Sequence, residues 1–256
     1  MPDREVRLEN LTRLEFRDAR KEGHFKLAII PTGSVEQHLE HLTMSQDISS
    51  STYVAEQVAN TLYPKVIVTV PMAIGISEHH MGFPGTLTAN PGGWLTVLFD
   101  TVESLVRHGI KNVLILNGHG GNVKPIEGSL RHWQLYFLSM YGALSSTTSS
   151  ISRNTRMEYK AKLLENGEPE VNLNFCSYWD VIPQKFANKV LDTGDSPGHA
   201  TEFETSIAMY AFPENVRPLT IPRNKDTTPS LATAQKGKLL MGKAIEGVSE
   251  IVGKML

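Results

Sequence analysis

The chain has 256 residues, of which 40% are hydrophobic and 20% charged, and its formal net charge is −2. This is an ordinary globular balance, and the length supplies ample material for the core of one α/β domain. The small net charge and the lack of a basic block argue against nucleic acid or an anionic membrane as a partner.

Two further features bear on the cellular compartment. The first residues lack the charged-then-apolar pattern of a signal peptide, and no apolar run approaches the ~18–20 residues that a membrane span needs. The single cysteine, Cys176, has no partner for an internal disulfide. We therefore expect a cytoplasmic protein in which Cys176 is a buried residue without a catalytic role.

Three short apolar runs predict the strands of a sheet, and each leads into a loop that contains glycine. They are residues 27–30, 66–70 and 113–116. Continuous apolar runs of this length, rich in β-branched residues, are typical of strands that are buried on both faces, as in a parallel sheet.

Helical patterns follow these strands, so the chain alternates strand and helix. The apolar spacing predicts helices over residues 48–62, 94–108, 122–138, 202–210 and 230–255. We expect Asp47 to cap the first of them and Gly109 to follow the second as its C′ residue.

This order predicts one α/β domain over residues 1–256, with a mostly parallel, doubly wound sheet and helices on both faces. Within it, the segment from about 145 to 198 is rich in turn-forming residues and is expected to be mainly loop.

Polar residues cluster where ligands bind in such sheets, at the carboxyl ends of the strands. Glu36, His38 and Asp47 follow the first strand, and they are the residue types that bind zinc or manganese. In extended backbone the Glu-x-His spacing points both side chains to one side. A polar surface loop, with Asp47 only capping its helix, is the alternative.

Two more clusters follow further along the chain. After the third strand, His119 stands among three glycines, which suits a tight loop that presents a ligand or, alternatively, cradles a phosphate. The P-loop and Rossmann spacings are absent. His199, Glu202 and Glu204 then precede or begin a helix, where the two carboxylates diverge by roughly 200°, so only one easily faces a shared site. The alternative is an acidic first helical turn.

A fourth segment, with Ser77, Glu78, His79 and His80, follows the second strand. Together the four segments resemble the signatures of the creatininase family, in the family's order, and the resemblance extends over nearly the whole chain. The matching stretches are Gly-Ser-Val-Glu-Gln-His at 33–38 with Asp47, Gly-Ile-Ser-Glu-His at 75–79 with Phe-Pro-Gly-Thr-Leu at 83–87, Asn-Gly-His-Gly-Gly-Asn at 117–122, and His199-Ala200 with Glu-Thr-Ser at 204–206.

The resemblance implies a centre with two divalent ions, Zn²⁺ or Mn²⁺ and conceivably Fe²⁺. Glu36 and His119 would be terminal ligands of one ion, His38 and Glu204 would be those of the other, and Asp47 would bridge them. Water bound there becomes a nucleophile near neutral pH. His199 would shuttle a proton to the leaving group, with Glu204 beside it as a second catalytic residue.

The same resemblance implies a small-molecule substrate and a homo-oligomer, often a hexamer. Ser77, Glu78 and His79 would line the substrate pocket, and Trp179 is a further candidate for its wall.

The chain departs from the family pattern at three places. Leu39 and Glu40 stand where many members have Gly-Pro, Gly121 stands where creatininase itself has a glutamate ligand, and Thr201 replaces a common glycine. Creatinine is therefore not the expected substrate. Either Glu204 supplies the oxygen that Gly121 lacks, or one ion is held more weakly.

Three functions remain as hypotheses. The first is metal-dependent hydrolysis of a C–N bond in a cyclic amide or formamide. The second is ring-opening C–C hydrolysis of a cyclic keto-polyol such as a dehydro-inosose. The third is a non-catalytic metal-binding subunit, against which the retention of all five ligands and His199 argues.

Overall fold

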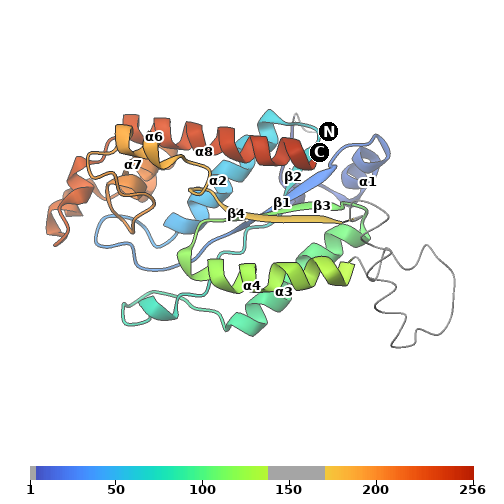
Figure 1. Ribbon diagram of the computed structural model, residues 1–256, viewed down its shortest axis with the longest axis horizontal. Helices are drawn as coiled ribbons and strands as arrows, with labels where there is room; N and C mark the ends of the chain where they lie inside the picture. Colours follow the sequence, from blue (N-terminus) through green and yellow to red (C-terminus); the bar gives the residue numbers. More distant parts are fainter. Residues whose placement is uncertain (1–3, 138–170) are drawn as a thin grey trace.

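The centre of the molecule is a four-stranded parallel sheet with the strand order β2-β1-β3-β4 (Figure 1). The computed structural model describes residues 4–137 and 171–256. The strands are β1 (Leu27–Thr32), β2 (Val66–Val68), β3 (Asn112–Asn117) and β4 (Asn172–Ser177). The prediction of a parallel sheet is confirmed, although β2 is shorter than the apolar run that predicted it.

Strand β4 was not predicted, because its sequence is Asn-Leu-Asn-Phe-Cys-Ser and lacks a continuous apolar run. Among the residues that the structure describes, it lies at the edge of the sheet and pairs with β3 alone, so it needs less apolar surface than a central strand. Its Cys176 is buried, and burial raises the pKa of the thiol to about 12. That environment fits a residue without a chemical role.

Helices cover both faces of the sheet, as predicted (Figure 1). Along β1, Leu27 and Ile29 pack with one apolar cluster, whereas Ala28 and Ile30 pack with a second cluster on the opposite face. This alternation follows from the two-residue period of a strand. The helices of the first face are α2 (Gln46–Thr61), α6 (Gln184–Val190), α7 (Glu202–Ala211) and α8 (Ala234–Met255); those of the second are α1 (Arg13–Lys21), α3 (Pro91–Arg107) and α4 (Gly120–Phe137).

The expected helix after β1 is present, but the prediction that Asp47 caps it is wrong. The helix α2 begins at Gln46, its N-cap position is Ser45, and Asp47 lies inside the first turn. Its carboxylate is buried and faces two histidines rather than the amides of its own helix. The predicted C′ role of Gly109 is confirmed, since it follows α3 and its cap residue His108 with φ +86°.

The C-terminal part contains more regular structure than the turn-rich composition suggested. Residues 145–170 of the predicted loop lie outside the described residues, but 171–198 include β4 and α6. The last helix begins at Ala234 rather than 230, because a short 3-10 turn, Thr228–Leu231, precedes it.

The order of the strands creates a switch point between β1 and β3. From β1 the chain crosses by way of α2 to β2 on one side, and from β3 it crosses by way of α4 towards β4 on the other. A crevice therefore opens at the carboxyl ends of β1 and β3, which is where open α/β sheets bind ligands.

None of the helices in residues 4–137 and 171–256 has the length and apolar character required to cross a membrane.

Candidate metal centre

The structure brings the five predicted ligands together above the switch point. Glu36 and His38 lie in the loop after β1, Asp47 is in the first turn of α2, His119 joins β3 to α4, and Glu204 is in the first turn of α7. All five side chains are buried. The site therefore gathers three carboxylates and two imidazoles where water has little access.

The ring of His38 has one nitrogen turned towards the backbone and the other towards carboxylates. Its Nδ1 donates to the carbonyl of Glu36 at 3.1 Å. Its Nε2 lies 3.0 Å from Oδ1 of Asp47 and 3.8 Å from Oε2 of Glu204. Because Nδ1 holds the proton of the neutral ring, Nε2 has a lone pair that is free to bind a cation.

His119 has the same arrangement with the two ring nitrogens exchanged. Its Nε2 lies 3.1 Å from the carbonyl of Ile76, to which it donates, and 3.1 Å from the hydroxyl of Ser77. Its Nδ1 lies 2.9 Å from Oδ2 of Asp47 and 3.3 Å from Oε1 of Glu36. The carboxylate of Asp47 thus lies between the two imidazoles, with a different oxygen towards each.

The pKa values of these groups show that the cluster favours positive charge. Burial lowers the pKa of His38, but the charges of Asp47 and Glu204 outweigh it and raise the value to about 9. Burial also opposes the shift of His119, whose hydrogen bonds to Asp47 and Glu36 raise its pKa to about 10. Burial raises the pKa of Glu204 to about 7. The neighbouring carboxylates that raise the pKa values of the two rings would equally attract a cation.

Three buried atoms of the cluster also indicate a site for a cation. In the described part of the chain, Oε2 of Glu36, Oδ2 of Asp47 and Nε2 of His38 have no hydrogen-bond partner, although carboxylate and imidazole atoms lie close by. Such atoms are costly to bury unless an ion satisfies them. Mixed nitrogen and oxygen donors of this kind suit zinc or manganese, so the residues fit the predicted metal.

Within the described residues, three overlapping trios have ligand atoms close enough to share an ion. The trios are His38-Asp47-Glu204, Glu36-His79-His119 and Glu36-His38-His199. The first agrees with the ligand set predicted for the second ion. The other two introduce His79 and His199, which were predicted as a pocket residue and a catalytic residue.

His199 lies above the cluster, next to His38 and His80. Its ring stacks on that of His80 with centroids 4.6 Å apart, and its side chain is 34% exposed. Burial and the charge of His38 lower its pKa to about 4. The amide of Gln37 contacts both His80 and His199. The sequence predicted no role for Gln37 or His80, although Gln37 lies within the motif at 33–38 and His80 directly follows the motif at 75–79.

A cavity of about 300 Å³ opens over the cluster. His79 and Trp179 are in its wall, together with His80 and His199. Ser77 is buried behind His119, and Glu78 is exposed and is not part of this wall. The polar groups of the cluster therefore face a space large enough for a small molecule.

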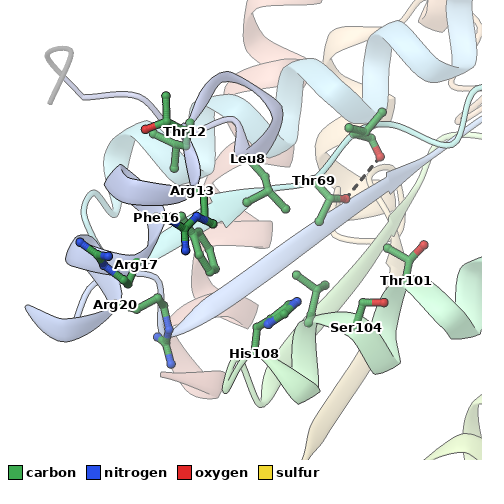
Figure 2. Close-up of a pocket in the computed structure, with 13 residues that line it drawn as sticks. Leu8, Thr12, Arg13, Phe16, Arg17, Arg20, Thr69, Thr101, Ser104 and His108 are labelled. Atoms are coloured by element: carbon green, nitrogen blue, oxygen red, sulfur yellow. Dashed lines mark hydrogen bonds between the residues drawn. The ribbon is translucent and has the colours of Figure 1, made fainter.

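A larger cavity, of about 820 Å³, lies between α1 and α3 (Figure 2). Phe16 and Leu8 line it beside the arginines of α1, and Thr101, Ser104 and His108 come from α3 or its cap. None of the five predicted ligands contributes to it. It has no cluster of carboxylates and imidazoles, so it is not the candidate metal centre.

The two carboxylates of α7 diverge as the helical spacing predicts. Glu204 faces His38, whereas Glu202 accepts hydrogen bonds from the amides of Asp192 and Thr193 at 3.0 and 2.9 Å and pairs with Lys236 at 2.5 Å. Glu202 therefore holds the loop that carries His199 and connects α7 to α8.

Gly121 has no space for a side chain. A Cβ at this position would collide with the carbonyl of Ile76 and with Nε2 of His119. The backbone here packs against the ring that it positions, so this chain has no room for a ligand at residue 121.

Comparison with known proteins identifies relatives over most of the chain. The family model "Creatininase: Creatinine amidohydrolase" matches residues 9–252. The creatinine amidohydrolase of Pseudomonas putida is 25% identical over 260 residues, which cover 88% of this chain and 87% of that protein. The 3-dehydro-scyllo-inosose hydrolase of Thermotoga maritima is 31% identical over 215 residues, which cover 82% of this chain and 57% of that protein.

The mycofactocin precursor peptide peptidase of Mycobacterium ulcerans is 32% identical over 110 residues, which cover 40% of this chain and less than half, 44%, of the peptidase. Among solved structures, a manganese form of creatininase has a TM-score of 0.73 at 20% identity and covers 97% of this chain and 98% of that one. A mutant of the Zn-Zn type has a TM-score of 0.72 at 20% identity, with 97% of both chains covered.

Proposed function

The chain belongs to the creatininase family of hydrolases, and from this premise we propose that Glu36, His38, Asp47, His119 and Glu204 hold two divalent ions. Glu36 and His119 would hold one ion, His38 and Glu204 would hold the other, and Asp47 would be shared between them. The observation that carries the proposal is the orientation of His38 and His119. In each ring, one N–H group donates a hydrogen bond to a backbone carbonyl, and the other nitrogen faces the carboxylate of Asp47.

Ions in this position would lower the pKa of bound water and polarise a substrate carbonyl. Substrate binding and proton transfer would depend on side chains of the protein. The cavity that would receive the substrate is lined by Trp179, His199 and the stacked rings of His79 and His119. Glu204 is the second catalytic candidate: burial raises its pKa to about 7, and a cation bound beside it would lower that pKa again.

The substrate class that we propose is a small cyclic amide or formamide, cleaved at its C–N bond. The activities named for the Pseudomonas and mycobacterial relatives favour this bond. Creatinine itself is not proposed, because the chain departs from the creatininase pattern at residues 39, 40 and 121. The enzyme would act as a cytoplasmic homo-oligomer, in keeping with the ring-shaped assemblies that the resemblance implies.

A cyclic keto-polyol opened at a C–C bond is the second candidate substrate. The Thermotoga inosose hydrolase matches 82% of this chain, at higher identity than the creatinine amidohydrolase. A polarised carbonyl and an activated water serve either reaction, so the two substrate classes need to be compared directly. Incubation of the zinc or manganese form with both classes, followed by mass spectrometry of the products, decides between them.

The first test is metal content. We expect close to two zinc or manganese ions per chain after reconstitution and almost none in Asp47→Ala, which loses the bridge. His199→Ala is the matched control, because it should keep the metal and lose most of the rate. One ion per chain would contradict the two-ion site, none would support the non-catalytic alternative, and full metal in Asp47→Ala would refute the bridging role.

A further inference from the structure

The side chain of Gln37 makes three polar contacts between the two ligand residues Glu36 and His38. Its Oε1 lies 3.1 Å from the backbone amide of Leu39. Its Nε2 lies 3.0 Å from Nδ1 of His80 and 2.8 Å from Nε2 of His199. One amide group therefore connects the backbone of this loop to both rings of the histidine stack.

The contact with Leu39 determines which way the amide faces. A backbone N–H only donates, so the atom opposite it must be the oxygen of Gln37. The NH₂ group then points at the two rings and donates one hydrogen to each. Nδ1 of His80 and Nε2 of His199 must both accept, and each must therefore have a lone pair.

This leaves one position for the proton on each neutral ring. His199 holds it on Nδ1 and His80 holds it on Nε2. These two N–H groups face the same carboxylate oxygen, because Nδ1 of His199 and Nε2 of His80 lie 3.8 and 3.7 Å from Oε1 of Glu36. The stacked rings, with planes 16° apart, are thus held between one amide and one carboxylate.

We propose that Gln37 is a positioning residue that holds His199 as the Nδ1–H tautomer. A ring in this state is not a metal ligand, because binding an ion through Nδ1 while accepting at Nε2 would require an imidazolate. The trio Glu36-His38-His199 is close enough to bind an ion, but its hydrogen bonds give His199 a different task from that of His38.

For the reaction, and resting on the proposed function, this tautomer makes His199 a hydrogen-bond donor. Its Nδ1–H can donate to an oxygen of the substrate that gains negative charge. It cannot take a proton from water at Nε2 unless the contact with Gln37 breaks. His199, which the sequence predicted to be a proton shuttle, is therefore proposed to act only as a hydrogen-bond donor to the substrate.

The experiment is ¹⁵N NMR of protein labelled at histidine, in the metal-free and the zinc-loaded forms at neutral pH, with magic-angle spinning so that particle size sets no limit. His80→Asn and His199→Asn identify the two signals. We expect the proton of His199 on Nδ1 and that of His80 on Nε2 in both forms. In Gln37→Met, which keeps the length but donates nothing, both rings should become mixtures of tautomers.

In Gln37→Glu, the carboxylate accepts instead of donating, so we expect both tautomers to reverse. A wild-type His199 protonated on Nε2 or on both nitrogens would overturn the inference, as would unchanged tautomers in the two variants. Zinc content tests the proposed metal centre separately from the tautomer of His199. Loss of zinc from the wild type refutes the metal centre, whereas zinc retained in Gln37→Met with shifted tautomers supports both.

Discussion

At the scale of single residues, two departures from the expected family pattern lie where the backbone is most constrained. Leu39 has φ +54°, a left-handed conformation that favours glycine, which is the residue that the family resemblance led us to expect there. Its backbone amide nevertheless holds the oxygen of Gln37, so the loop keeps its shape without the glycine. Gly121 lies against His119 and occupies the space that a glutamate would need.

The close packing around Gly121 leads to a testable prediction, for which the adjacent Gly120 is the control. Gly121→Ala should reduce zinc content and lower the free energy of unfolding by about 1–3 kcal/mol, because the added methyl group displaces Ile76 or His119. Gly120→Ala has open space around the new methyl group and should change stability by less than about 0.5 kcal/mol. Urea unfolding and elemental analysis measure both effects, and equal effects in the two variants would refute this account.

At the scale of secondary-structure elements, α7 and α8 are joined by an ion pair. The side chain of Glu202 is fully buried and that of Lys236 is 18% exposed. Asp192 accepts a second contact from the same ammonium at 2.7 Å. The pair connects α8 to the loop before His199, so the last helix supports the wall of the cavity.

We expect Lys236→Met to lower the free energy of unfolding by about 2 kcal/mol at neutral pH, since it leaves a buried carboxylate without its cation. Lys238→Met, on the exposed side of the same helix, should have almost no effect. Burial alone would raise the pKa of Glu202, but the hydrogen bonds from Lys236, Thr193 and Asp192 lower it. The ionised Glu202 therefore contributes its full stabilisation of the fold at pH values above its ordinary pKa of 4.5. That stabilisation is lost as the pH falls through the lower pKa of the folded state.

Chemical denaturation of both variants between pH 7 and pH 3 tests this pair. The loss of unfolding free energy caused by Lys236→Met should become smaller at the acid end of that range. A loss that grows on acidification would contradict the assigned charges.

At the scale of the whole molecule, the candidate ligands come from four separate parts of the chain. The loop after β1, the first turn of α2, the end of β3 and the first turn of α7 meet only in the folded protein. Repulsion among three buried carboxylates opposes this assembly until positive charge offsets it. We therefore expect metal binding to be coupled to the stability of the fold.

Zinc should consequently raise the melting temperature. At a concentration about 100 times the dissociation constant, binding adds about 2.7 kcal/mol, which for a chain of this size is about 5–10 °C. Circular dichroism melts with zinc, and again after addition of EDTA, measure the shift and its reversal. Asp47→Ala should show no shift, and a shift equal to that of the wild type would place the stabilising ion elsewhere.

The sequence alone predicted the parallel sheet, the helices on both of its faces and the residues of the candidate centre. Three of the four strands are continuous apolar runs, and Glu36, His38 and His119 follow two of them at the edge where ligands bind. Patterns of this kind are local, so they can be read along the chain. Strand β4 was missed because an edge strand does not need such a run.

Only the tertiary structure decided what each histidine does. Nε2 of His119 meets the carbonyl of Ile76, which is 43 residues away, and Nε2 of His199 meets Gln37, which is 162 residues away. In the proposed function, the first contact would leave Nδ1 of His119 free to bind a metal, and the second would leave a proton on Nδ1 of His199 to donate to the substrate. Both of these partners are distant in sequence, so no local pattern of residues encodes them.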